Sequence, residues 1–145
     1  MRGKFLGLGL IISASSVAAH DRTEELLSIP TTADYSAAQA VTAPVIEHIE
    51  AEDLDGAIAL IAAGSEIFAS KKAELNVLKG QAGSLTTIYG PVEKCILSSR
   101  DYVSELRIRL SYICQHSELL VQWTFSVDQV PRGWIVSNFR FQDQF

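Results

Sequence analysis

Two segments in the C-terminal half carry an apolar side chain at every second position, with mostly polar residues between. Apolar residues occupy every second position over residues 106–114 and again over residues 119–127. A period of two places successive side chains on opposite faces of a strand, so both segments are predicted to be half-buried β-strands. Shorter apolar runs at residues 92–98 and 134–141 predict two more strands. The intervening stretches are of hairpin length, and they predict a four-stranded antiparallel meander.

The N-terminal half shows helical spacing instead. An Ala-rich segment over residues 36–50 has an apolar residue at every fourth position, and Pro44 within it predicts a kink or a break. Asp53 is a candidate N-cap for a second helix that closes at Gly64. A third helix is predicted over about residues 67–87. Three N-terminal helices followed by a meander sheet predict an α+β fold with the helices packed on one face of the sheet.

The first residues are typical of an export signal. Arg2 and Lys4 precede a short apolar run at residues 5–12, and the small residues at 17–19 fit cleavage before His20. The run is shorter than the about 20 residues that a membrane span needs. The predicted organisation is a signal peptide (1–19), a flexible leader (20–35) and one α+β domain (36–145). The mature chain is expected to be periplasmic or secreted, with no membrane span.

Charge and motif content narrow the function classes. The formal net charge of −5 disfavours a nucleic-acid partner. The sequence has no glycine-rich phosphate loop, no GxSxG elbow, no HExxH pair and no EF-hand loop. We therefore predict no catalytic residue, no metal ligand and no cofactor.

A family resemblance follows from the turn and the aromatic positions. Tyr89-Gly90-Pro91 precedes the predicted sheet, Trp123-Thr124-Phe125 lies in its third strand, and residues 133–141 read GWIVSNFRF. This combination resembles small secreted bacterial proteins of unknown function with a cystatin-like or NTF2-like α+β fold. The resemblance implies a domain that binds small apolar ligands, dimerises through its sheet, or acts as an isomerase or hydratase.

The leading hypothesis is a non-catalytic domain that binds a small apolar ligand or a protein partner. The candidate pocket residues are aromatic side chains of the third predicted helix and of the predicted strands, with ordinary core packing as the alternative: Phe68, Tyr89, Tyr112, Trp123, Phe125, Trp134 and Phe139. The enzyme alternative would need a buried acid or phenol from among Glu93, Asp101, Tyr35 and Tyr112. A third hypothesis is a purely structural envelope protein.

Two further expectations concern the sheet. Leu97, Ile113 and Leu120 are predicted to point outward, and such an apolar strip favours a homodimer through the outer sheet face.

The second expectation concerns the two cysteines. A first hairpin that turns near Tyr102 would leave Cys95 roughly 16 Å from Cys114 along the strand. That distance exceeds the Cα separation of about 7 Å that a disulfide tolerates. Two free, partly buried thiols are expected, with a slipped register or an intermolecular bridge as alternatives.

Overall fold

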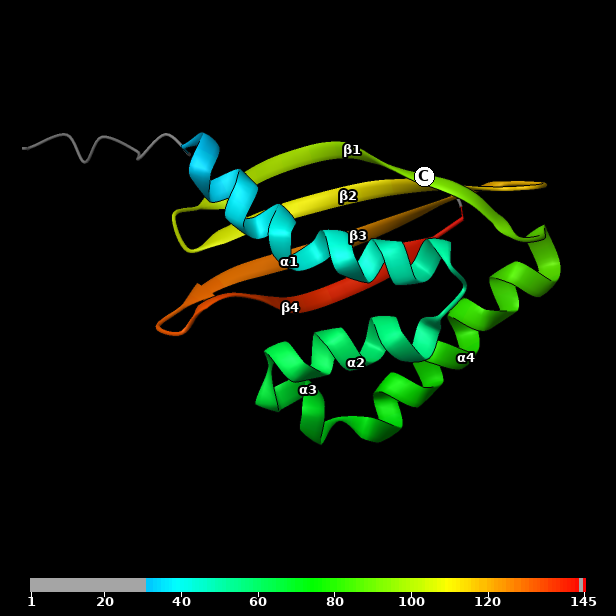
Figure 1. Cartoon of the computed structure of the whole chain (residues 1–145), viewed down its shortest axis with the longest axis horizontal. Helices are drawn as coiled ribbons and strands as arrows, with labels where there is room; N and C mark the ends of the chain where they lie inside the picture. Colours follow the sequence, from blue (N-terminus) through cyan, green and yellow to red (C-terminus); the bar gives the residue numbers. More distant parts are fainter. Residues whose placement is uncertain (1–30, 144) are drawn as a thin grey trace, which may run out of the picture.

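The computed structural model describes residues 31–143 and 145. The predicted signal peptide and residues 20–30 of the predicted leader lie outside these residues. Within them, four helices precede one four-stranded antiparallel sheet (Figure 1). The α+β class and the meander are therefore confirmed, whereas the prediction of three helices is wrong. No helix among residues 31–143 is long and apolar enough to cross a membrane.

The first helix, α1 (Thr32–Glu50), begins four residues earlier than predicted. The reason is a capping box: the Thr31 hydroxyl accepts a hydrogen bond from the Asp34 backbone N–H, and the Asp34 carboxylate accepts one from the Thr31 N–H. These bonds satisfy backbone donors that a helix start leaves unpaired. Pro44 does not end the helix, which bends along its length (Figure 1).

The remaining helices are α2 (Leu54–Gly64), α3 (Glu66–Ser70) and α4 (Lys72–Tyr89). Asp53 caps α2 as predicted, since its carboxylate accepts a hydrogen bond from the Gly56 N–H at 2.9 Å. The predicted third helix is divided at Lys71 into α3 and α4. The Ser70 hydroxyl donates to the Ile67 carbonyl at 2.7 Å, a local bond that competes with the helical pattern at this break.

The sheet consists of β1 (Val92–Ser104), β2 (Arg107–His116), β3 (Leu120–Val130) and β4 (Gly133–Gln142), in that spatial order. Residues 99–104, predicted as a connection, belong to β1, and the first hairpin turns at residues 105 and 106. The helices lie on one side of the sheet (Figure 1). We call the side that faces them the inner face and the opposite side the outer face.

The late turn overturns the expectation for the cysteines. Cys95 lies directly opposite Cys114, with a Cα–Cα distance of 4.0 Å, and the two form a disulfide. The prediction of free thiols was wrong because it placed the turn near Tyr102. The same register puts Leu97 opposite Tyr112, on the inner face, where Leu97 packs against the core. The outward residue of β1 at this level is Ile96.

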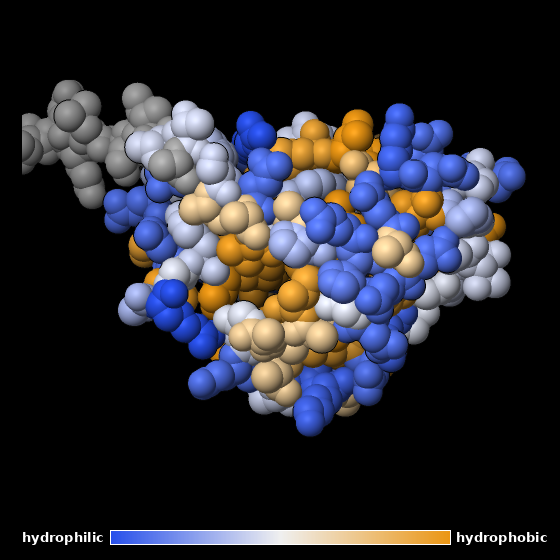
Figure 2. Space-filling view, viewed as in Figure 1, coloured by the Kyte–Doolittle hydropathy of each residue, from blue (hydrophilic) through white to orange (hydrophobic). Residues whose placement is uncertain are grey.

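The core forms where the inner face meets α1, α2 and α4. The central strands supply alternate buried residues: Ile108, Leu110, Tyr112 and Cys114 from β2, and Val121, Trp123, Phe125 and Val127 from β3. Aromatic contacts join neighbouring strands; Tyr112 meets Phe125 edge-on with ring centroids 5.9 Å apart. The helices do not close this layer completely. Figure 2 shows apolar side chains around a hollow between α1 and α2.

Candidate functional site

An open cavity of about 250 Å³ lies between the end of α1, the start of α2, helix α4 and the inner face of the sheet. Apolar side chains form most of its wall. Its lining residues are Ile49, Glu52, Leu54, Ala82, Gly83, Leu85, Thr86, Thr87, Val92, His116 and Trp123. Three separate stretches of the sequence, residues 49–54, 82–92 and 116–123, therefore share one space.

Gly83 leaves room for this cavity. A Cβ atom added at Gly83 would meet Leu54 Cδ1 at 3.8 Å, which is ordinary van der Waals contact. A larger side chain there would extend into space that is now open. Gly80, one turn earlier in α4, has nothing within 4 Å of a Cβ and does not line the cavity. The two glycines of the same helix thus differ in their relation to the site.

Trp123, a residue of the wall, has a buried polar atom without a partner. Its side chain is 4% exposed, and among the described residues its indole N–H is the only buried side-chain N or O atom without a hydrogen-bond partner. Leaving a buried donor unpaired costs about 1–3 kcal/mol. Because the indole nitrogen is enclosed by protein, a molecule in the open cavity would contact the Trp123 ring and not this N–H.

His116 and Glu52 add polar groups whose hydrogen bonds are partly used within the protein. His116 is buried, and its Nδ1–H donates to the Gly90 carbonyl at 2.8 Å, so Nε2 is the free acceptor of the neutral ring. The exposed Glu52 has a left-handed backbone (φ 59°), and its carboxylate accepts a hydrogen bond from the Val92 N–H at 3.2 Å. Glu52 thereby ties the α1–α2 turn to the start of β1.

Sequence reasoning named neither His116 nor Glu52 as a site residue. His116 continues the inward alternation of β2, so that pattern was a usable signal. Glu52 carries no comparable signal, because its position depends on the geometry of a turn between two helices.

Of the seven aromatic candidates, one lies in the open cavity, namely Trp123. Phe125 and Phe139, together with Trp123, line a small neighbouring space of about 10 Å³, which is at the lower limit for one water molecule. The Tyr112 hydroxyl bonds that of Thr42 at 2.7 Å. Phe68 packs on Phe139 with centroids 6.1 Å apart.

The last two candidates lie near the ends of the sheet. The Tyr89 hydroxyl donates to the Asp143 carboxylate at 2.5 Å, and this bond raises the pKa of Tyr89. Trp134 is half-buried and packs against the core at the start of β4.

The candidates for acid–base chemistry do not come together. Glu93 and Asp101 are exposed on β1, and Tyr35 is half-buried on α1. Tyr112 is buried, and desolvation raises its pKa, so its phenol stays protonated at neutral pH. None of the four lines the open cavity. Within the part of the chain that the structure describes, no group of three His, Cys, Asp or Glu side chains is placed to hold a metal ion.

The outer face carries the predicted apolar strip in corrected form. Ile96 and Ile113 are paired across β1 and β2, and Leu120 lies at the nearby start of β3. Ile96 and Leu120 are 56% and 46% exposed. With Ile96 in place of Leu97, a homodimer through this strip stays a prediction.

Comparison with models of protein families, with curated protein sequences and with solved structures gave no match to this chain.

Proposed function

We propose that this protein is a non-catalytic binding domain that holds a small, neutral, mostly apolar molecule in the cavity between α1, α4 and the inner sheet face. The open cavity itself carries this proposal, because side chains from helices and strands surround it with a mostly apolar wall. The apolar wall supports a ligand that is mostly hydrophobic.

The chemistry of the ligand follows from the wall and its rim. A volume of about 250 Å³ suits a molecule smaller than a typical drug. The Glu52 carboxylate at the rim disfavours an anionic ligand by like-charge repulsion. A neutral ketone, ester or ether on a compact hydrocarbon body combines one acceptor for the hydroxyl groups of Thr86 and Thr87 in the lining with the apolar surface that the cavity would bury.

We further propose that the domain works outside the cytoplasm and belongs to the NTF2-like class. The basic, apolar and small-residue pattern of residues 1–19 supports export. The Cys95–Cys114 disulfide supports an oxidising compartment. N-terminal sequencing of the protein recovered from its host would begin at His20 if the proposal holds, and at Met1 if no signal is removed.

The cavity is tested by filling it from α4. Gly83→Leu places a side chain in the open space, whereas Gly80→Leu places the same side chain on the same helix where it faces nothing. Cyclohexanone is a suitable probe because it joins one carbonyl acceptor to a compact apolar ring. Saturation-transfer NMR should detect its binding to the wild type and to Gly80→Leu, and should detect none to Gly83→Leu.

Equal cyclohexanone binding by all three proteins would overturn the proposal, as would absence of binding to the folded wild type. Near-ultraviolet circular dichroism checks that each variant keeps its tertiary packing. Native mass spectrometry of the protein from its own host would then show the mass of any molecule carried in the cavity.

A further inference from the structure

The outer face of the sheet contains a second hollow, of about 220 Å³, whose whole lining is polar. Its residues come from three adjacent strands: Arg109, Thr124, Ser126, Asn138 and Arg140. Arg109 is paired with Ser126, which is paired with Asn138, while Thr124 is paired with Arg140. The five residues thus form one block in the middle of the outer face.

The two arginines flank the hydroxyl groups of β3. Strands β2 and β4 lie on either side of β3, so their backbones are roughly 10 Å apart. Two arginine side chains extending over β3 can bring both guanidinium groups to one small ion. Thr124 is buried at the base, and its hydroxyl lies 3.3 Å from that of Ser111.

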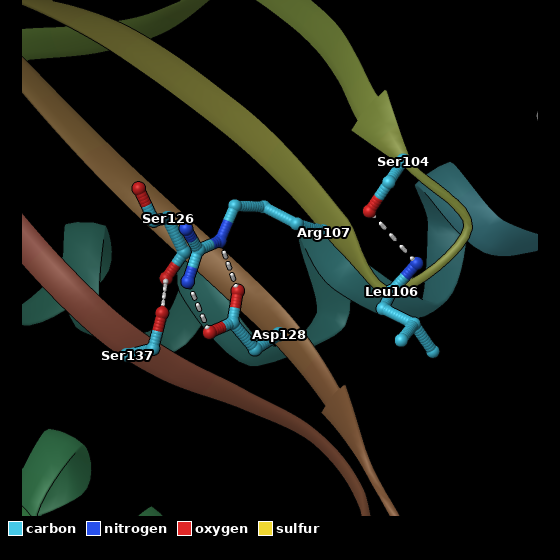
Figure 3. Close-up of polar contacts among 6 residues, drawn as sticks. All are labelled: Ser104, Leu106, Arg107, Ser126, Asp128 and Ser137. Carbon is cyan, nitrogen blue, oxygen red and sulfur yellow. Dashed lines mark hydrogen bonds and ion pairs between the residues drawn. The ribbon is translucent and has the colours of Figure 1, made fainter.

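The nearest carboxylate of β3 is already neutralised by another arginine. Asp128 accepts two hydrogen bonds from Arg107, at 2.6 and 2.7 Å (Figure 3). Asp101 lies opposite Arg109 in the register, but the two form no ion pair. Arg109 and Arg140 have neither an ion pair nor a hydrogen bond from their side chains within residues 31–143 and 145.

We propose that this hollow binds a phosphate group, either as the free ion or as a phosphate ester. Two guanidinium forks provide charge-assisted, geometrically matched donors for phosphate oxygens. The hydroxyl and amide groups of Thr124, Ser126 and Asn138 add neutral donors, and no carboxylate lines the hollow to oppose an anion. Because the five residues belong to paired strands, their backbone positions are fixed before the ion arrives. The proposal does not depend on the cavity of the inner face.

The test is a titration of the folded chain with sodium phosphate at constant ionic strength, followed by amide NMR shifts. The wild type should show saturable shifts confined to the outer-face positions of β2, β3 and β4. Arg109→Gln and Arg140→Gln should each raise Kd by about threefold to tenfold, and the double variant by more than tenfold.

Arg132→Gln is the matched control, because Arg132 donates to the Gly64 carbonyl and does not line the hollow. Its phosphate affinity should equal that of the wild type. An equal affinity for the wild type and the double variant would overturn the proposal, and so would shifts that never saturate.

A second arm identifies the source of the phosphate group. Sedimentation is measured with vesicles of phosphatidylcholine, with and without phosphatidic acid. Saturable binding of free phosphate without vesicle binding indicates a soluble ligand, and arginine-dependent binding to phosphatidic acid indicates a lipid headgroup. If neither phosphate binding nor vesicle binding changes when Arg109 and Arg140 are replaced, the site is rejected.

Discussion

The two faces of the sheet arise from one alternating pattern but have different physical roles. Phe125 and Thr124 are neighbours on β3, and both are buried. Phe125 lies on the inner face among aromatic rings of the core, and Thr124 lies on the outer face among hydroxyl groups and arginines. A buried residue of this sheet is therefore not always a residue of the hydrophobic core. Stability should depend on the inner face, while the outer face is free to carry polar recognition.

The largest loss of stability is expected from a substitution in the inner face. Phe125→Ala should lower the free energy of unfolding by about 3–5 kcal/mol, because it removes a fully buried ring and leaves a cavity. Thr124→Ala should cost about 1 kcal/mol or less, since it removes one hydroxyl with a long hydrogen bond. Urea denaturation of both variants gives the difference. Similar costs for the two substitutions would contradict the assignment of roles.

Removing the disulfide should have the next largest effect. Cys95 and Cys114 are 19 positions apart, so the double substitution Cys95→Ser, Cys114→Ser should cost about 2–4 kcal/mol in free energy of unfolding. Thiol titration of the unfolded, unreduced wild type should find no free thiol. Two reactive thiols there would contradict the bond between Cys95 and Cys114.

A smaller effect tests how α1 is attached to the inner face. Tyr112→Phe removes the hydroxyl that bonds Thr42 at 2.7 Å and keeps the ring in the core. The expected loss is about 1 kcal/mol in the free energy of unfolding. In a double-mutant cycle, Tyr112→Phe and Thr42→Val should show a coupling of similar size. Additive losses would mean that the two hydroxyl groups do not interact.

The smallest effect belongs to the outer face. Hydrogen bonds from Arg107 lower the pKa of Asp128, so this pair adds stability above the ordinary carboxyl pKa and loses it as the pH falls below about 4. Asp128→Asn should cost about 1 kcal/mol or less at neutral pH. Its stability should also fall less than that of the wild type between pH 5 and about pH 2. If the stability of the wild type and of Asp128→Asn falls equally with decreasing pH, the ion pair does not contribute to stability.

The sequence predicts the central strands better than the edge of the sheet. Alternation defined the inner and outer residues of β2 and β3, and the structure confirms them. The register of β1 was missed because its polar second half resembled a loop, and because irregularities in the ladder shift its pairing. That single error accounts for both Cys95 and Leu97.

The candidate site was less predictable than the sheet. An aromatic on the inner face is evident at Trp123, but the open cavity beside it depends on Gly83, Leu54 and Val92 from three different elements. These residues come together because of the angles at which the helices pack on the sheet, and those angles cannot be deduced from local sequence patterns. The polar hollow of the outer face was equally hidden, because Arg109 and Arg140 meet only through the register of β2, β3 and β4.

The indole N–H signals test the central claim most directly. The chain has two tryptophans, Trp123 in the cavity wall and Trp134 outside it, and the variant Trp134→Phe assigns their two signals. On addition of cyclohexanone, we predict a saturable shift of the Trp123 indole proton, because the Trp123 ring forms part of the cavity wall, with the Trp134 signal unchanged. A saturated titration in which the Trp123 signal does not move would contradict a ligand bound in this cavity.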